Sequence, residues 1–216
     1  MGSEGRLRGT EQAVRDRVAT AGELGLDVAV FDDHERAVLA TISDMAIDNG
    51  RVRIAVSAWA PDMCSPELLK DLRKLQDRLD TWATIHLNQI WGEVAAIQAH
   101  RNLLPTEYLA ELGFLNERLI CAHCRCMNPR EEKILGQAGV TVSFNSAIAA
   151  RRGLSPRISD LEEYGCTIAM GSDNMAEDMV EVRRTGLFMD PIRRENGRLP
   201  KPQPPLRLAT RTGDQR

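Results

Sequence analysis

The chain has 216 residues, of which 43% are apolar and 27% are charged, with a formal net charge of −3. This length can bury a substantial core, as one large domain or two small ones. The net charge is slightly negative and the basic residues are scattered, so nothing indicates a nucleic-acid or membrane partner. No apolar run approaches the roughly 18 residues of a membrane helix. Five cysteines in a chain whose first residues, MGSEGRLRG, lack a hydrophobic segment fit a reducing cytosol, and we expect a cytoplasmic protein.

Strand-like and helix-like segments alternate along the chain. Apolar, β-rich runs predict strands near 35–43, 51–59, 82–87, 117–124, 140–145 and 166–173. Helix-like stretches lie at 11–24, from Ser65, over 92–112 with a break near Pro105, from Asn128, near 157–164 and over 177–189. Ser65 and Asn128 each precede a proline, which is the pattern of an N-cap and a first helical position. Strands separated by single helices predict parallel strands that are adjacent in chain order, with the helices outside.

Polar side chains recur where four of these strands end. They are His86, His123, Asn145 and Asp173. In a (β/α)₈ barrel the carboxyl ends of several strands meet at one face, and active sites are assembled there. We therefore expect His86, His123 and Asp173 to converge on one cavity, with Asn145 on its rim.

The residues around these positions resemble a known family. The motifs IHLNQ, ICAHC, VSFNSAIAARRG and IAMGSDN, in this order, are similar to those of the amidohydrolase superfamily. The longer piece GSDNMAEDMVEVRRTGLFM is the most specific, and WAPDMCSPELL resembles the loop that follows strand four in the family. The resemblance covers roughly 35–211. It is closest to cytosine-deaminase-like, chlorohydrolase-like and S-adenosylhomocysteine-deaminase-like enzymes.

The resemblance implies a TIM-type barrel that holds one divalent metal, zinc or iron. His86 matches the metal-binding histidine of strand five, and Asp173 matches the aspartate of strand eight, which binds the metal and acts in catalysis. His123 matches the catalytic histidine of strand six, which hydrogen-bonds the hydrolytic water or the substrate. Such a metal lowers the pKa of water toward ~7. Asp173 would take the proton of the water, while His123 stabilises the developing charge. Asn145 is expected to bind substrate.

Two departures from the family pattern stand out. Many deaminating members carry a glutamate three residues after the strand-five histidine as a proton shuttle, and Gln89 stands at that position. An amide cannot transfer a proton, so we expect Gln89 to bind substrate and Glu93 to be a solvated helix carboxylate. The second departure is the absence of an H-x-H metal-binding pair, because the remaining histidines, His34 and His100, are expected to be surface residues.

Counting back from His86, the strands near 82–87, 51–59 and 35–43 become five, four and three. We therefore expect an incomplete α/β (β/α)₈ barrel with strands three to eight present. Strands one and two and most of a β-sandwich domain would be absent. The expected domains are a helix and loop over 1–34, the partial barrel over 35–190 and a proline-rich tail over 191–216. Such a chain should retain metal weakly and hydrolyse nothing alone. Its open sheet edges invite association, so a homo-oligomer is one expectation.

The function expected is metal-dependent hydrolysis of a carbon–nitrogen bond, by deamination or dechlorination of a small nitrogen heterocycle. The alternative is a non-catalytic barrel remnant that lacks the H-x-H ligands. The motif CAHCRC offers further interpretations, a structural zinc site or a C-x-x-C redox centre. A structural zinc site usually needs a second ligand pair. A redox C-x-x-C normally opens a helix, whereas this one closes a strand.

Overall fold

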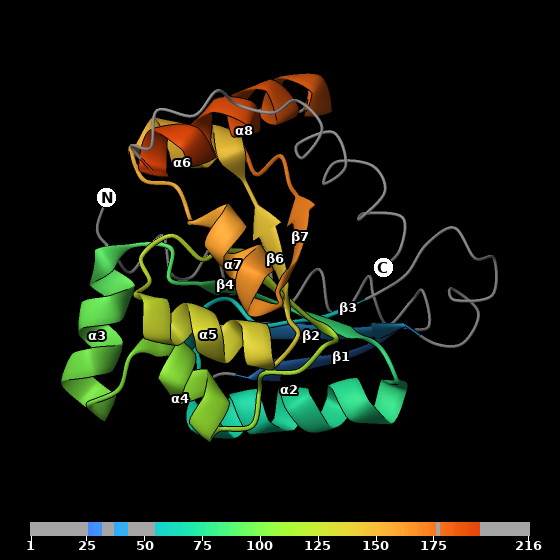
Figure 1. Ribbon diagram of the computed structural model, residues 1–216. Coiled ribbons are helices and arrows are strands. Elements are labelled where there is room, and N and C mark those ends of the chain that lie inside the picture. The colour runs from blue at the N-terminus through green and yellow to red at the C-terminus, as the bar shows by residue number, and fades with distance from the viewer. Residues whose placement is uncertain (1–25, 32–36, 43–54, 176–177, 195–216) are drawn as a thin grey trace, which may run out of the picture. The chain divides into compact units, whose positions relative to one another are not determined.

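The computed structural model describes residues 26–31, 37–42, 55–175 and 178–194 (Figure 1). The chain divides into two compact units. The first contains Met1–Trp59 and Met63–Ala83, and the second contains Ala60–Asp62 and Thr84–Arg216. Within the described residues, no helix is both long enough and apolar enough to cross a membrane. The predicted helix over 11–24 and the tail over 195–216 lie outside this part of the chain.

A two-stranded sheet lies near the start of the first unit. Strands β1 (Leu26–Phe31) and β2 (Ala37–Ile42) pair antiparallel, with Leu26 opposite Ile42 and Phe31 opposite Ala37. The prediction for 35–43 was therefore right about a strand and wrong about its pairing, since β2 does not join the parallel sheet. Strand β1 was not predicted, and it lies where 1–34 was expected to be helix and loop. Only five residues separate the two strands, whereas a parallel crossover needs a dozen or more.

The rest of the first unit is a short strand and a long helix. Strand β3 (Ala55–Ser57) is the described part of the strand predicted over 51–59. A 3₁₀ turn, η2 (Pro61–Met63), precedes helix α2 (Pro66–Leu79) in the chain. The predicted cap is confirmed, because the Ser65 hydroxyl accepts the backbone N–H of Leu68 at 3.1 Å. Helix α2 buries its leucine face, formed by Leu68, Leu69 and Leu72.

The sheet of the second unit follows the chain order that was predicted. Its strands are β4 (Trp82–Leu87), β5 (Leu119–His123), β6 (Thr141–Phe144) and β7 (Thr167–Met170), adjacent in that order. Strand β4 begins with two residues of the first unit. Strands β5 and β6 pair parallel, and so do β6 and β7, where Phe144 lies opposite Met170. This parallel sheet confirms the α/β class.

Six helices of the second unit accompany these strands. They are α3 (Trp91–Arg101), α4 (Pro105–Glu111), α5 (Pro129–Gln137), α6 (Ser146–Arg152), α7 (Ile158–Tyr164) and α8 (Met179–Arg194). The predicted break at Pro105 and the Asn128 cap of α5 are both confirmed. Figure 1 shows α5 beside α7 and α6 beside α8. Helix α5 approaches the end of α7 closely, because a Cβ on Gly136 would lie 2.1 Å from the carbonyl oxygen of Tyr164.

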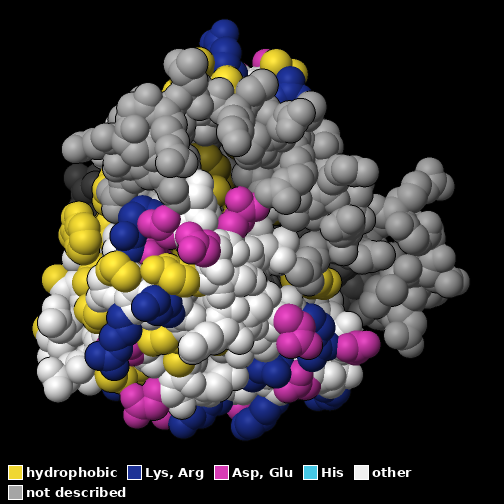
Figure 2. All heavy atoms as spheres, viewed as in Figure 1, with side chains coloured by type: hydrophobic (Ala, Val, Ile, Leu, Met, Phe, Trp, Pro, Cys, Tyr) yellow, Lys and Arg dark blue, Asp and Glu magenta, His cyan; other side chains and the backbone are white. Residues whose placement is uncertain are grey.

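Side chains of β5 alternate between buried and partly exposed positions. Leu119, Cys121 and His123 are buried, while the residues between them are partly exposed. The core of the second unit includes Leu87, Leu109, Phe114, Leu135, Val142, Leu161 and Ile168. On the face drawn in Figure 2, Lys and Arg side chains are interspersed with Asp and Glu, which matches the mixed, scattered charge of the sequence.

Candidate active site

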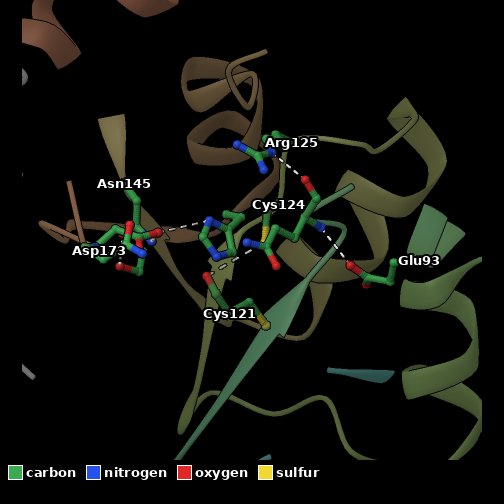
Figure 3. A network of polar contacts seen from close by, with 10 residues as sticks. Glu93, Cys121, Cys124, Arg125, Asn145 and Asp173 are labelled. Atoms are coloured by element: carbon green, nitrogen blue, oxygen red, sulfur yellow. Dashed lines mark hydrogen bonds and ion pairs between the residues drawn. The ribbon is translucent and has the colours of Figure 1, made fainter. Parts of the chain in front are cut away.

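The polar residues predicted at the strand ends lie together in the second unit. The rings of His86 in β4 and His123 at the end of β5 are stacked, with centroids 5.3 Å apart and planes 19° apart. Asp173, after β7, places Oδ2 at 3.8 Å from Nδ1 of His123. Asn145, directly after β6, donates from Nδ2 to the same carboxylate oxygen at 3.4 Å, and Figure 3 shows these two side by side. The structure brings these four residues together, as predicted, and that they line a substrate cavity remains a prediction.

Asn145 lies deeper than the rim position expected for it. Its side chain is buried, and its Oδ1 accepts a hydrogen bond from the Ser143 hydroxyl at 3.0 Å. Gly171 makes this packing feasible, because a Cβ there would lie 2.4 Å from Oδ1 of Asn145 and 2.7 Å from Oγ of Ser143. The amide is therefore fixed from two sides and can orient the carboxylate of Asp173.

The backbone at these strand ends is unusual. His123, Cys124 and Asp173 have φ values of 77°, 47° and 53°. Positive φ is uncommon for residues other than glycine and costs conformational energy, and such residues cluster at functional sites. The turn at Asp173 also lets its Oδ1 accept the N–H of Asn174 at 2.6 Å. Both carboxylate oxygens of Asp173 are thus engaged.

His123 sits in an environment that disfavours its protonated form. Its side chain is almost fully buried. Burial, reinforced by the neighbouring His86, lowers the pKa of His123 from 6.5 to about 4, although Asp173 acts in the opposite direction. Near neutral pH the ring is therefore uncharged and carries one donor and one acceptor nitrogen. Such a ring can hydrogen-bond a water molecule or a substrate atom without first losing a proton.

Asn88, two residues after His86, connects the turn after β4 to three other segments. Its Nδ2 donates to the carbonyl of Cys126 at 2.9 Å and to Oε1 of Glu131 at 3.2 Å. Its Oδ1 accepts from the hydroxyl of Thr106 at 3.2 Å. Asn88 was assigned no role in the sequence analysis. An asparagine directly after a strand-end histidine was the available signal, because asparagine tolerates the left-handed conformation such turns require.

Glu93 corrects an expectation. It was predicted to be solvated, but only 2% of it is exposed. Its carboxylate accepts the backbone N–H groups of Asn88 at 2.7 Å and Gln89 at 2.8 Å. The physical reason is that Glu93 lies in the first turn of α3 and folds back over the preceding turn. Burial raises the pKa of Glu93 from 4.5 to about 7. In Figure 3 it lies on the far side of Cys124 from Asp173, so it supports the site from behind.

Arg125 is a further polar residue that was not predicted. It is 3% exposed, and its Nε donates to the carbonyl of Gln89 at 2.5 Å. Its Nη1 has no hydrogen-bond partner in the described part of the chain. Gln89 itself is partly exposed, and its backbone is held by Glu93 on one side and Arg125 on the other. The proposed substrate contact of the Gln89 side chain remains a prediction.

The cysteines do not support the C-x-x-C interpretations. All five, Cys64, Cys121, Cys124, Cys126 and Cys166, are buried and form no disulfide. Burial raises the pKa of Cys124 well above its usual value and that of Cys166 to about 12. Thiols in this state are poor metal ligands and poor nucleophiles. His100 is exposed, as expected, and His34 lies outside the described residues.

The described residues supply only part of a metal site. His86 and Asp173 are donor types that zinc takes, but a catalytic zinc needs about three protein ligands and a water. Among the residues that the structure describes, no three His, Cys, Asp or Glu side chains are grouped so that they could hold a metal ion. The chemistry of the two donors fits zinc, and a zinc site here would need further ligands from outside the described residues.

The fold and the site together define an α/β protein with a polar cluster where parallel strands end. The model of the amidohydrolase family matches residues 21–201, and the chain belongs to this family.

Known proteins that resemble the chain are deaminases and a chlorohydrolase. A 5′-deoxyadenosine deaminase of Methanothermobacter thermautotrophicus is 30% identical over 167 residues, which cover 74% of this chain and 38% of that protein. A zinc-bound adenosine deaminase from Xanthomonas campestris superposes with a TM-score of 0.72 at 24% identity, covering 80% of this chain and 40% of that one. A zinc complex of atrazine chlorohydrolase from Arthrobacter aurescens superposes with a TM-score of 0.67 at 21% identity, covering 77% of this chain and 38% of that one. The two structures show the likeness of fold. The chain spans less than half the length of these relatives.

Proposed function

We propose that this chain carries part of the active site of a metal-dependent hydrolase, which releases an amino group from a nitrogen heterocycle by attack of water. The observation that carries the proposal is the cluster of His86, His123 and Asp173. Deamination is favoured over dechlorination because the relative at 30% identity is named a deaminase. Family membership and this cluster also favour an enzymatic site over a non-catalytic remnant.

His86 and Asp173 would hold the metal, zinc or iron. When bound, such a metal supplies a Lewis acid that lowers the pKa of water toward about 7. The ligands beyond these two would come from outside the described residues, as the missing H-x-H pair implies.

The chain's own residues would handle the protons and the developing charge. Asp173 would accept the proton of the attacking water, with its carboxylate kept in place by Asn145 and by the N–H of Asn174. His123 would hydrogen-bond the water or the substrate as a neutral ring, consistent with its low pKa. Gln89 cannot transfer protons, so Asp173 would carry the proton to the leaving amine. Gln89 and Asn145 would contact the substrate.

Zinc binding by purified chain tests the ligand assignment. Competition with a chromophoric chelator should show weak binding by the wild-type chain. We expect binding to fall at least about tenfold in His86→Ala and in Asp173→Asn. His100→Ala, which removes an exposed histidine, is the matched control and should bind as the wild type does. Zinc binding that is insensitive to both ligand variants would overturn the assignment.

Ammonia release tests the reaction. It should be measured with adenosine, guanine and an aminotriazine, on the chain and on a form extended at its N-terminus by a segment with an H-x-H pair. We expect release from the extended form. His123→Asn should abolish this release without removing the zinc. Chloride release from a chlorotriazine without ammonia release from any substrate would favour dechlorination instead.

A further inference from the structure

The two histidines of the cluster are each followed by a loop, and the two loops are joined by backbone hydrogen bonds. His86 lies two residues before Asn88, and His123 lies two residues before Arg125. The carbonyl of Asn88 accepts the N–H groups of Arg125 at 3.2 Å and of Cys126 at 2.9 Å. The separation of the two histidine rings therefore depends on how the turn at Asn88 is held.

The side chain of Asn88 adds further hydrogen bonds to this connection between the two loops. Its amide engages Cys126, Glu131 and Thr106 through three hydrogen bonds. Asn88, Glu131 and Thr106 are each no more than 1% exposed. Water cannot replace a lost partner at such a place, and an unsatisfied buried group is costly. The network is thus satisfied only when both loops and the start of α5 are in register.

The backbone of Asn88 restricts the residue types that could do this. Its φ is 51°, a conformation that asparagine and glycine adopt at lower cost than most residues. Glycine would satisfy the backbone but make none of the side-chain bonds. Aspartate would place a second carboxylate beside that of Glu131. Asparagine therefore combines both requirements at this position.

We propose that Asn88 is a positioning residue, which sets the stacked arrangement of His86 and His123 by tying the turn after β4 to the loop after β5. Any consequence for metal binding rests on the proposed function. The ring arrangement itself does not, because it belongs to the metal-free chain.

The test compares Asn88→Gly with the wild type in metal-free chain, by NMR of the two imidazole rings. Glycine can keep the backbone conformation and removes the whole side chain with its amide. We expect the ring-to-ring nuclear Overhauser effects between His86 and His123 to weaken by about half or more. Arg157→Ala is the matched control. It removes the ion pair with Glu132 that joins α7 to α5 but none of the hydrogen bonds of Asn88, and should leave these signals unchanged.

Two further measurements keep the outcome clear. If Asn88→Gly does not fold, Thr106→Val serves as the test variant. It deletes one of the three side-chain hydrogen bonds of Asn88 and should weaken the ring-to-ring signals of His86 and His123 to a smaller extent. Chelator competition should show zinc binding about 10–100-fold weaker in Asn88→Gly. Unchanged ring signals in the folded variants, or an equal change in Arg157→Ala, would overturn the positioning role. A wild-type chain that binds no zinc would instead count against the proposed function.

Discussion

The backbone N–H of Asn88 lies 2.7 Å from Oε1 of Glu93, and both groups are shielded from water. Glu93 thus holds the turn after His86, although its burial penalises the charged form that makes the better acceptor. Burial raises the pKa of Glu93 to about 7, although the two backbone N–H groups act to lower it. Glu93 and His123 are consequently two buried groups, close to one site, whose pKa values are displaced in opposite directions.

The first prediction concerns the pH dependence of the free energy of unfolding. The pKa of Glu93 is raised from 4.5 to about 7, so its contribution is fully present below 4.5 and is lost as pH rises through 7. The pKa of His123 is lowered from 6.5 to about 4, so its contribution is present above 6.5 and is lost as pH falls through 4. Each shift is worth about 3 kcal/mol. The two should nearly cancel between pH 4.5 and 6.5.

Urea unfolding of metal-free protein at several pH values between 4 and 7.5 checks this. In Glu93→Gln, stability should rise with pH relative to the wild type, because only His123 remains. In His123→Gln it should fall with pH. Glu131 and Asp62, whose pKa values are also raised by burial, are present in all three proteins, and their charges add to the raised pKa of Glu93. Parallel curves for Glu93→Gln and the wild type would contradict the raised pKa of the buried Glu93 carboxyl.

The second prediction concerns the ion pair between α5 and α7. Arg157 donates from Nε to Oε1 of Glu132 at 2.8 Å and from Nη2 to the other oxygen, and the Glu132 carboxylate is only 2% exposed. Arg157→Ala removes both of these charge-assisted hydrogen bonds from a buried carboxylate, so we expect a loss of about 3 kcal/mol in the free energy of unfolding. Urea denaturation measures this loss.

The same ion pair has an internal control. The double replacement Arg157→Leu with Glu132→Leu should lose less than Arg157→Ala, because no uncompensated charge is left. Arg130→Ala breaks a pair whose arginine is 79% exposed, and it should cost less than about 1 kcal/mol. Equal losses in the free energy of unfolding for Arg157→Ala and Arg130→Ala would show that the buried pair at Glu132 stabilises the fold no more than an exposed pair does.

Sequence patterns predicted α2 and the elements of the second unit apart from α6, because local chemistry determines them. Ser65 and Asn128 cap helices through their own side chains, and β4 to β7 are apolar runs with clear boundaries. The pairing of β2 with β1 was missed because the β-propensity of a segment does not determine which strand it pairs with. The five-residue separation from Phe31 was the one cue, and it indicates a hairpin only once 26–31 is recognised as a strand.

The candidate site divides in the same way. His86, His123 and Asp173 were predictable because the alternation within a strand and the common direction of parallel strands bring such residues together. Glu93 was not, because a carboxylate in the first turn of a helix is usually exposed. Its burial depends on the turn after β4, which contacts loops that are distant in the sequence. Long-range contacts of this kind leave no periodic signal.

The third prediction concerns Gly171, which follows β7. A Cβ at this position would lie 2.4 Å from Oδ1 of Asn145, closer than real Cβ contacts come. Gly171→Ala should therefore push the amide of Asn145 away from Asp173 and reduce the free energy of unfolding by about 1–3 kcal/mol. Urea unfolding measures the stability. The displacement of the amide can be followed by the NMR shift of the Asn145 side-chain N–H groups.

Gly92→Ala is the matched control for this change. Gly92 lies in the first turn of α3. An added Cβ would lie 3.5 Å from its nearest neighbour, Cδ1 of Ile90, which is an ordinary van der Waals distance. Alanine also favours helix over glycine, so this variant should be as stable as the wild type or slightly more stable. If Gly171→Ala behaves as Gly92→Ala does, and the Asn145 amide signals do not move, then Asn145 is not confined as the structure indicates. Its proposed role in orienting Asp173 would then lose its physical basis.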